Sequence, residues 1–457
     1  MDDFSKIVEN QRIYFNGGST QNIDFRINAL KKLKKAIEDN ESLILKALKE
    51  DLNKNEAEAY MTEIGVSLSE ISYMIKNIQK FLKKKKVKTP LAYMGSKSYI
   101  VPEPLGIALI ISPWNYPFQL AINPLIGSIA AGNCSILKNS SMSPNTSKAI
   151  KKIISDNFEE NYIYVADNDK GMSSRVLEEK YDYIFFTGSP SIGRVVMSSA
   201  SKNLTPVTLE LGGKSPCIVH KDADLKTSAK RICFGKFSNA GQTCVSPDYV
   251  LVHKDISKAF VEEIKNTLIT FYTENPENSD KYGKIINAKH FNRLKNLLSE
   301  GKIEIGGQTC EDKLYIAPTV MNEVSLDSTL MEEEIFGPIL PVIEYTNLDS
   351  IIKFINMRSK PLALYIFSKN PETQNKIIKS TSSGGVCVND TLIHMTSNYL
   401  PFGGVGESGM GNYHGLASFK VFSHEKSILK SSTLIDMKIY PPYDISLKKL
   451  KKLLKFL

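Results

Sequence analysis

Short apolar runs that alternate with helical segments constrain the fold of this chain more than any other feature. The run at 106–111, Gly-Ile-Ala-Leu-Ile-Ile, contains no polar residue and stops at a Ser-Pro pair. Such a run is typical of a strand buried on both faces of a parallel sheet. Further runs of this kind, separated by segments of helical periodicity, lie at 134–137, 162–165 and 183–186. The alternation predicts an α/β fold with a doubly wound sheet, and such sheets bind ligands at the carboxyl ends of their strands.

The alternation resumes after Gly212 and predicts a second α/β domain. Its apolar segments lie near Ile218 and at 250–252, 339–342 and 362–367. The chain has 457 residues, which is too long for one core. Ahead of the first sheet, apolar residues at helical spacing predict helices across 1–80, including one over about 56–82. A basic, extended segment follows at 83–100, and we expect it to pair with a strand at 418–422.

The excess of positive charge does not by itself indicate a protein that binds nucleic acid. The net charge is +9, and the run Lys83–Lys86 lacks the interleaved aromatic residues that bind single strands. The acidic start of the chain does not resemble a secretory signal, and no apolar run approaches the ~18–20 residues of a membrane-spanning helix. Six cysteines without a CxxC pair predict reduced thiols and no metal site. We therefore expect a soluble, cytoplasmic protein.

Cys244 and Glu210 are candidates for a nucleophile and a base. Cys244 follows Ser-Asn-Ala-Gly-Gln-Thr, a polar approach, whereas buried structural cysteines usually lie in apolar runs. Glu210 lies in Leu-Glu-Leu-Gly-Gly-Lys at 209–214, and alone it could be a surface carboxylate at a strand end. Asn115 follows the first apolar run and is either a turn residue or an amide donor to an oxyanion. Together, the thiol and the carboxylate could serve one covalent mechanism.

The stretch 185–193, Phe-Phe-Thr-Gly-Ser-Pro-Ser-Ile-Gly, is the better candidate for a phosphate-binding turn. Gly188 permits a tight turn, and Ser189 precedes a helix-like run whose start would favour a pyrophosphate. An ordinary strand-turn-helix unit explains the stretch equally well. The GxGxxG match at 404–409 follows no strand, so we do not expect it to bind a dinucleotide. The Gly-Lys-Ser at 213–215 lacks the first glycine of a phosphate loop, because that position is Thr208.

Five motifs in this order resemble the aldehyde dehydrogenase superfamily. They are Pro-Trp-Asn-Tyr-Pro at 113–117, Phe-Thr-Gly-Ser at 186–189, Leu-Glu-Leu-Gly-Gly-Lys-Ser-Pro at 209–216, Gly-Gln-Thr-Cys at 241–244 and Glu-Ile-Phe-Gly-Pro at 334–338. Four further motifs resemble the class-three, fatty-aldehyde branch of this superfamily. They are Pro-Phe-Gly-Gly-Val-Gly at 401–406, Ser-Gly-Met-Gly at 408–411, Tyr-His-Gly at 413–415 and Tyr-Pro-Pro-Tyr at 440–443. The resemblance covers nearly the whole chain.

The resemblance implies a Rossmann-like cofactor domain, a catalytic α/β domain and a small β arm for oligomerisation. The expected ranges are 1–82 with 101–209 for the dinucleotide-binding domain, 210–396 for the catalytic domain, and 83–100 with 397–435 for the arm. The remaining 436–457 is basic and amphipathic, with leucines at helical spacing through Leu457. This segment could dock on a partner subunit, cover a pocket mouth or rest on a membrane surface, and we favour docking within the protein.

The resemblance also implies a role for each motif in the NAD(P)-dependent oxidation of aldehydes to carboxylic acids. Cys244 would attack the aldehyde to form a thiohemiacetal and then a thioester, and Glu210 would activate the water that hydrolyses it. The amide of Asn115 and the backbone N–H of Cys244 would bind the oxyanion. The implied cofactor contacts are Lys138, Ser141, Gly188, Ser189, Gly193, Leu211, Glu334 and Phe336. The implied substrate pocket includes Tyr60, Tyr116 and the stretch 392–396 with Ile393 and Thr396.

Ser141 is a departure from the family pattern. The family usually has Lys-Pro-Ser/Ala-Glu where this chain has Lys-Asn-Ser-Ser at 138–141. The usual Glu binds ribose hydroxyls and repels a 2′-phosphate, so the uncharged Ser141 implies that NADP is tolerated alongside NAD. The implied substrates are medium- or long-chain aliphatic or aromatic aldehydes, and the implied assembly is a homodimer.

Three rival functions remain open at this point. An acylating dehydrogenase would form acyl-CoA, but such enzymes generally lack the base, so Glu210 argues against this reading. A catalytically silent structural relative would not need Cys244, Glu210 and Asn115 together. A protein that binds nucleic acid or membranes through its lysines would bind in a strongly salt-dependent manner.

Overall fold

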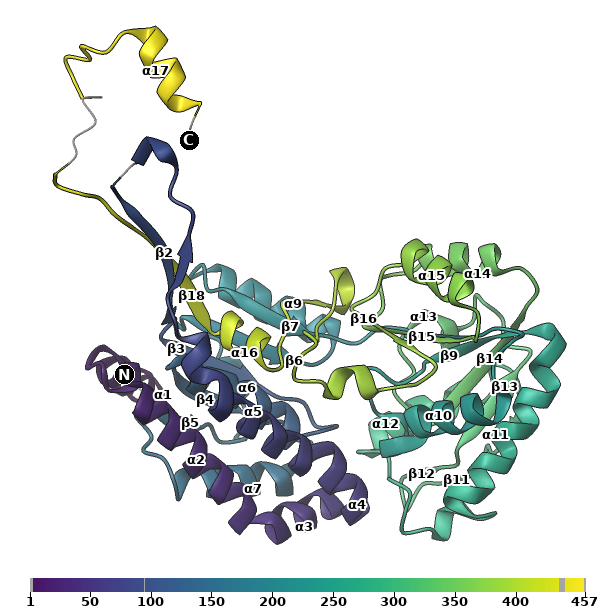
Figure 1. The fold of residues 1–457 in the computed structure, drawn as a ribbon. Helices are drawn as coiled ribbons and strands as arrows, with labels where there is room; N and C mark the ends of the chain where they lie inside the picture. The colour runs from purple at the N-terminus through teal and green to yellow at the C-terminus, as the bar shows by residue number, and fades with distance from the viewer. Residues whose placement is uncertain (1–2, 94, 435–439, 456–457) are drawn as a thin grey trace.

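The computed structural model describes residues 3–93, 95–434 and 440–455. Two α/β units lie side by side, and a β arm projects from the first of them (Figure 1). Each unit is built around its own largely parallel sheet, which confirms the predicted α/β class with a doubly wound sheet. The assignment of residue ranges to domains stays a prediction.

The first sheet has the strand order β17-β7-β6-β3-β4-β5. Its parallel strands are β3 (Ile107–Ile111), β4 (Cys134–Lys138), β5 (Ile163–Val165), β6 (Tyr183–Thr187) and β7 (Val207–Glu210). The edge strand β17 (Gly409–Met410) runs antiparallel to β7. From β3 the chain winds outward through β4 and β5, and then returns to the other side of β3 for β6 and β7. The order therefore reverses between β3 and β6, which is where sheets of this type bind ligands.

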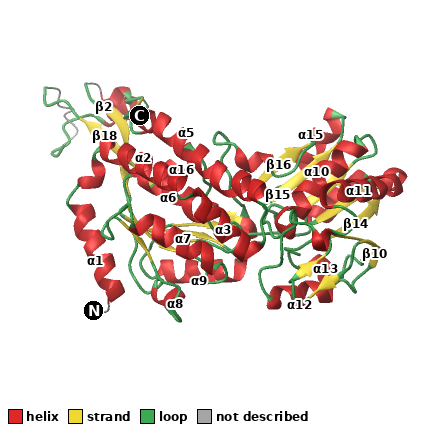
Figure 2. Ribbon diagram, turned by 90° about the horizontal axis from the view of Figure 1, so that it is seen from below, coloured by secondary structure: helices red, strands yellow, loops and turns green. Residues whose placement is uncertain are grey.

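Both faces of this sheet are covered by helices, as Figure 2 shows. Ile107 and Leu109 of β3 belong to one buried cluster with residues of α1 and α9, whereas Ala108 and Ile110 belong to the larger core on the opposite face. Because alternate residues of a strand point to opposite faces, burial on both sides requires an uninterrupted apolar run. The helices around this sheet are α1 (Asp3–Asn16), α2 (Ile23–Asp39), α3 (Glu41–Leu52), α6 (Gln119–Ala131), α7 (Pro144–Ser155), α8 (Met172–Arg175) and α9 (Pro190–Ser201).

The single helix predicted over 56–82 contains an irregular turn. The segment consists of α4 (Glu56–Ala59), a π-helical turn (Tyr60–Ile64) and α5 (Gly65–Phe81). A π turn holds an extra residue, so it rotates the side chains that follow, and such turns are frequent at functional sites. Here Glu63 and Ile64 are both fully buried. Glu63 is thereby a carboxylate in the core of the protein.

The second sheet has the order β10-β13-β14-β9-β8-β15-β16 and confirms the predicted second α/β unit. Its strands are β8 (Pro216–Val219), β9 (Tyr249–His253), β10 (Lys302–Ile305), β13 (Thr319–Asn322), β14 (Ile339–Tyr345), β15 (Ala363–Phe367) and β16 (Gly385–Val388). All of them are parallel except β10. The same part of the chain holds α10 (Leu225–Phe237), α11 (Ser257–Tyr272), α12 (Ala288–Leu297), α13 (Thr329–Glu332), α14 (Leu348–Asn356), α15 (Pro371–Ser380) and the hairpin of β11 (Thr309–Cys310) with β12 (Tyr315–Ile316).

The arm consists of β1 (Lys85–Val87), β2 (Lys97–Pro104) and β18 (Ser423–Lys430). The prediction of a strand at 418–422 was wrong, because this stretch belongs to α16 (Leu416–Val421), and the strand that pairs with β2 begins at Ser423. Phe419 and Phe422 stand three residues apart and are both buried in the core. Gly127 of α6 lets α16 approach closely, since a Cβ there would lie 2.8 Å from Ser418. Residues three apart lie on one face of a helix but on opposite faces of a strand, so the burial of both rings in the core favours the helix.

The C-terminal lysine-rich segment forms α17 (Leu447–Leu454), as predicted, within the described residues. Leu457 and the predicted boundary at 435–436 lie outside those residues. Leu447 and Leu454 are exposed, and α17 lies beyond the tip of the arm in Figure 1. Its docking partner therefore stays a prediction. In the part of the chain that the structure describes, every helix is too short or too polar to cross a bilayer.

Candidate active site

Cys244 and Glu210 lie in the walls of one narrow cavity. Glu210 ends β7, and Cys244 lies shortly before β9, so the cavity forms where the carboxyl end of the first sheet meets the amino end of the second. Tyr116, Thr187 and Thr243 also line it. Its volume of about 20 Å³ is enough for roughly one water molecule. The fold thus brings together the thiol and the carboxylate that the sequence singled out.

Glu210 is a buried carboxylate whose side chain is left free. The residue is only 3% exposed, and its backbone is fixed by pairing with Gly409 and by a hydrogen bond from the N–H of Gly188 to its carbonyl at 3.0 Å. Among the described residues, neither carboxylate oxygen has a hydrogen-bond partner. Burial raises the pKa of this carboxyl well above its usual range. A carboxylate of raised pKa is a stronger general base once it is ionised.

The loop before Cys244 has a left-handed backbone at three successive residues. The φ angles are 52° at Asn239, 50° at Ala240 and 73° at Gly241. This conformation costs a non-glycine residue roughly 1–2 kcal/mol, so other contacts must hold the loop. The backbone N–H of Asn239 donates to the Glu58 carboxylate at 2.7 Å, and the side chain of Gln242 bonds to the backbone of Lys284 and Ile286.

The thiol of Cys244 is harder to ionise than an ordinary cysteine. Burial raises its pKa most, and the carboxylates of Glu334 and Glu210 raise it further. Hydrogen bonds from the backbone N–H groups of Cys244 and Val245 act in the opposite direction, because they stabilise the thiolate. Lys138 does not line this cavity, and its ammonium donates to Asn139 and Asn168 at 2.8 and 2.7 Å. A base is therefore needed to prepare this nucleophile.

Asn115 is tied directly to the loop that carries the cysteine. It is 3% exposed, and its side-chain amide donates to the carbonyl of Gln242 at 3.0 Å. The next residue, Tyr116, shares a hydrogen bond of 2.7 Å between its hydroxyl and that of Thr243. Asn115 is not among the residues that line the cavity, but a side-chain amide has a second N–H that can serve an oxyanion.

The residues expected to hold the pyrophosphate of a dinucleotide lie at the strand-order reversal. Ser189 caps the start of α9, and Pro190 occupies the first helical position. Gly193 on α9 packs against Leu211, since a Cβ there would lie 2.8 Å from the leucine side chain. Close helix-to-sheet packing and a helix N-terminus next to Gly188 are what a pyrophosphate site requires. These residues therefore fit a nicotinamide dinucleotide.

Glu334 lies close to Cys244 and to the motif that carries Glu210, and Phe336 lies beside Trp114. The Glu334 carboxylate packs so closely on Gly212 that a Cβ there would lie 1.9 Å from one of its oxygens. Burial raises the pKa of Glu334, while the N–H of Gly213 and the ammonium groups of Lys214 and Lys236 lower it. The ring of Phe336 meets Trp114 edge-on at 5.3 Å. A carboxylate here fits the task of accepting bonds from ribose hydroxyls.

Ser141 and most of the predicted substrate residues are exposed. Ser141 stands on the surface, whereas Lys138 is buried. Tyr116 lines the cavity, but the exposed side chains of Tyr60, Ile393 and Thr396 do not. Their contact with substrate stays a prediction.

Several cavity residues were not singled out from the sequence. They are Gln119, Leu120, Thr187, Thr243, Leu362, Phe402 and Tyr413, whereas Met395, which also lines the cavity, lies in the predicted stretch 392–396. Most of these residues stand inside or beside a motif already named, and this proximity is the signal that could have found them. Leu362 is the exception, because it lies just before β15 and far from any motif in the sequence.

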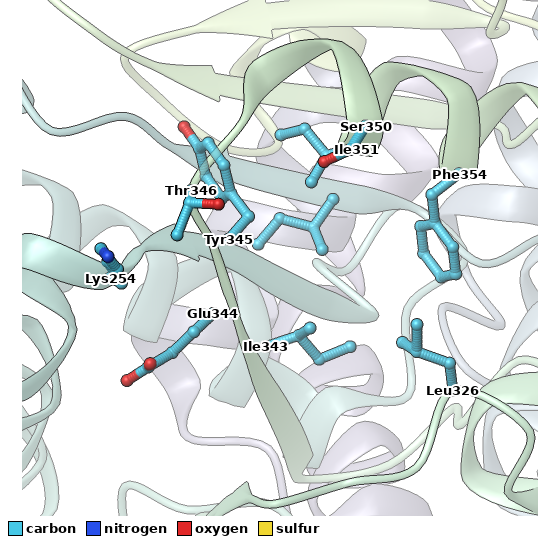
Figure 3. Close-up of a pocket in the computed structure, with 10 residues that line it drawn as sticks. Lys254, Leu326, Ile343, Glu344, Tyr345, Thr346, Ser350, Ile351 and Phe354 are labelled. Atoms are coloured by element: carbon cyan, nitrogen blue, oxygen red, sulfur yellow. The ribbon is translucent and has the colours of Figure 1, made fainter.

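A second hollow lies against the second sheet and shares no residue with the cavity around Cys244. Figure 3 shows its wall, in which Ile343, Ile351 and Phe354 face the opening and Lys254 and Glu344 lie toward one side. No cysteine or histidine lines it. Its wall does not offer the nucleophile and base of the first cavity.

Comparisons with known proteins identify the family. The sequence model of the aldehyde dehydrogenase family matches residues 1–428. The 4,4'-diaponeurosporen-aldehyde dehydrogenase of Staphylococcus aureus is 48% identical over 97% of each chain, and aldehyde dehydrogenase family 3 member B1 of Bos taurus is 45% identical over 94% of this chain and 92% of its own. A solved structure, the substrate-bound state of Staphylococcus aureus AldH, matches with a TM-score of 0.97 at 47% identity, covering 99% of this chain and 100% of its own. The chain therefore belongs to the aldehyde dehydrogenase family, with class-three members among its similar relatives, and is an oxidoreductase that acts on aldehydes with NAD or NADP.

Proposed function

We propose that this enzyme oxidises aldehydes to carboxylic acids in two covalent steps, with Cys244 as the nucleophile, Asn115 as an oxyanion donor and Glu210 as the base. The observation that carries the proposal is the shared cavity, in which an unpartnered, buried carboxylate and a thiol line a space for roughly one water molecule. No structural ion pair or capping bond accounts for Glu210 within the described residues. A role in proton transfer does explain why an unpartnered carboxylate stands at this position.

In the first step the sulfur of Cys244 bonds to the aldehyde carbon. The thiol must first lose its proton, and Glu210 is the carboxylate on the same cavity wall that can take it and pass it to water. As the C–S bond forms, the carbonyl electron pair moves onto oxygen, where the Asn115 amide and the Cys244 N–H stabilise the negative charge. When that pair returns, the C–H bond breaks with loss of hydride, and a thioester of Cys244 remains.

In the second step water hydrolyses the thioester. Glu210 accepts a proton as the water oxygen bonds to the acyl carbon, and the C–S bond then breaks to release the acid and the thiolate. Burial beside the cavity raises the pKa of Glu210, so a larger share of the carboxyl is protonated at neutral pH than for an ordinary glutamate. Deacylation should therefore rise with pH over a range above the usual titration of glutamate, near pH 4.3.

When bound, NAD or NADP accepts the hydride. The residues that would hold it are Ser189 with the start of α9, Gly193 against Leu211, and Glu334, whose carboxylate would accept bonds from ribose hydroxyls. The exposed, uncharged Ser141 supports use of both cofactors, because a 2′-phosphate would meet no carboxylate from this residue.

The proposed substrates are apolar aldehydes, of medium or long aliphatic chain or with an aromatic ring. Leu120, Leu211, Leu362, Met395 and Phe402 give the cavity a mainly apolar wall. The Staphylococcus aureus relative is named for 4,4'-diaponeurosporen-aldehyde, so this compound belongs in a test panel beside a series of alkanals of increasing length.

The experiment that tests the two-step mechanism uses Glu210→Gln. The variant lacks the base that takes the thiol proton, so it should form the thioester more slowly, and it should release acid about 10²-fold or more slowly. Because release is then the slowest step, intact mass should show an acyl adduct that Cys244→Ala lacks. Its steady-state rate should also lose the rise with pH. Undiminished turnover in Glu210→Gln would rule out this base. Product analysis with coenzyme A present separates the acylating alternative, since only that enzyme would form acyl-CoA.

We propose a homodimer formed through the arm. β18 pairs with β2 along its whole length, and its other edge has no strand partner among the described residues. An exposed edge readily pairs with another chain. Light scattering during gel filtration should give twice the mass of the chain, and a monomer at micromolar concentration would contradict this assembly.

A further inference from the structure

Lys54 and Glu63 form an ion pair in the core of the protein. Both side chains are fully buried, and the Lys54 ammonium lies 2.5 Å from the Glu63 carboxylate. Removing two charges from water costs several kcal/mol per ion, so such a pair is often no more stable than apolar residues of the same size. A pair that gains little stability can still be retained for what it holds in place.

The ammonium of Lys54 contacts Asn115 and Tyr116, two adjacent residues that follow β3. The side chains of both residues are hydrogen-bonded to the loop that carries Cys244. The ammonium donates to the backbone carbonyl of Asn115 at 3.1 Å, and it stands 3.8 Å from the centre of the Tyr116 ring. The other end of Tyr116 bonds to Thr243, the residue before Cys244. One cation therefore fixes the dipeptide that carries the proposed oxyanion donor.

Glu63 holds the same segment from its other side. Its second carboxylate oxygen accepts the backbone N–H groups of Phe118 and Gln119, each at 3.0 Å, at the start of α6. The carbonyl of Asn115 also accepts a bond of 2.8 Å from the side chain of Asn239 in the cysteine loop. Residues 115–119 are thus clamped between the two charges, and Asn115 is braced against the loop from both its carbonyl and its amide.

We propose that Lys54 is a positioning residue for catalysis, which holds the amide of Asn115 in place for the oxyanion, with Glu63 as its counter-charge. The proposal rests on the proposed function, in which Asn115 stabilises the oxyanion. The π turn at Tyr60–Ile64 contributes by carrying the Glu63 carboxylate, whose side chain is buried, to the pair. Lys54 itself touches neither substrate nor cofactor in this assignment.

The test is a double-mutant cycle between Lys54→Met/Glu63→Gln and Asn115→Ala. Removing both charges together avoids leaving either member of the pair buried and unpaired. Glu58, which also faces Lys54 and accepts the N–H of Asn239, is left unchanged in every variant of the cycle. The first readout is the burst of nitrophenolate from p-nitrophenyl acetate. Attack of Cys244 on this ester passes through an analogous tetrahedral oxyanion, which expels nitrophenolate and needs no cofactor. The second is hydride transfer in a single turnover with a saturating alkanal.

Lys54→Met/Glu63→Gln should slow both readouts by about 10- to 100-fold. This decrease approaches the fall in rate that follows the removal of one oxyanion donor. KM for the alkanal should change by less than about 3-fold, because the substrate contacts remain. On the Asn115→Ala background the same substitutions should slow both readouts by less than about 3-fold, because residues that act through one another are not additive.

A control is Arg12→Met/Asp182→Asn, which removes a partly exposed ion pair that joins α1 to the segment just before β6. Asp182 pairs with Arg12 and, like Glu63, accepts a backbone N–H, here from Ile107 at 2.8 Å. This control should lower the thermal midpoint without changing the burst. If Lys54→Met/Glu63→Gln does not fold, Lys54→Gln/Glu63→Gln, which keeps a neutral donor and acceptor, carries the same cycle.

Equal losses on the two backgrounds, or a burst of wild-type size in the paired variant, would overturn the positioning role alone. An Asn115→Ala enzyme with a wild-type burst and wild-type hydride transfer would instead overturn the oxyanion role of Asn115, and the positioning role with it. The cycle thus separates failure of the further proposal from failure of the proposed function.

Discussion

Glu63 and Glu210 are two carboxylates in equally buried surroundings that differ in their partners. Burial raises the pKa of both. Glu63 is bonded by Lys54 and by two backbone N–H groups, whereas Glu210 has no bond to its carboxylate from any described residue. A buried polar group that lacks partners weakens the fold, so Glu210 is retained at a cost in stability. The contrast separates a carboxylate that holds structure from one that is free to move protons.

Loss of the thiol beside Glu210 should have the largest effect. Cys244→Ala leaves the unpartnered carboxylate with nothing to activate, so kcat should fall by about 10³-fold or more. Steady-state reduction of NAD measures this. Cys310→Ala, at a partly exposed cysteine in β11, is the matched control and should keep its activity. A residual rate of more than a few per cent in Cys244→Ala would contradict the role of Cys244 as the nucleophile that Glu210 serves.

The second prediction compares the two carboxylates through the free energy of unfolding. Glu63→Gln leaves the Lys54 ammonium buried without its counter-charge and should cost about 3–5 kcal/mol. Glu210→Gln removes a carboxylate that has no partner, so the change should be less than about 1 kcal/mol. Denaturant unfolding of the apoenzymes measures both. Equal losses in the two variants would mean that Glu210 is held by contacts as strong as those of Glu63.

The smallest effect concerns a carboxylate added on the surface. Ser141→Glu should change stability by less than about 0.5 kcal/mol, because the site is exposed. It should raise the preference for NAD over NADP by about 10-fold, since a charge near a 2′-phosphate repels it by roughly 1 kcal/mol or more. The ratio of kcat/KM for the two cofactors measures this, with Ser141→Gln as the neutral control. If the ratio of kcat/KM for NAD and NADP is the same in Ser141→Glu and Ser141→Gln, residue 141 does not determine the choice of cofactor.

The parts of the fold predicted from the sequence are those set by local patterns. The two sheets follow from apolar runs such as 106–111, and Cys244 with Glu210 follows from motifs around them. The arm strand was misplaced because Phe419 and Phe422 fit a strand or a helix, and only their burial against α6 decides between them. Such a choice depends on a tertiary contact that local periodicity does not contain.

The Lys54–Glu63 pair could not be predicted for a different reason. Charged residues in loops and on helices are normally solvated, and nothing near Lys54, which lies in the loop between α3 and α4, indicates that it reaches Asn115. The contact joins residues 61 positions apart, and the π turn that carries Glu63 has no known sequence signature here. The burial of Lys54 depends on contacts with residues distant in the sequence, so it can be recognised only from the three-dimensional structure.

The narrow cavity has a further consequence for the rate of turnover. A space of about 20 Å³ beside Cys244 and Glu210 holds roughly one water molecule, so an aldehyde of several carbons does not fit it. The walls formed by Tyr116, Leu362 and Tyr413 would have to move apart before the aldehyde carbon reaches the sulfur and again before the acid leaves. The rate of this opening would then set an upper limit on turnover that does not depend on the chemical steps.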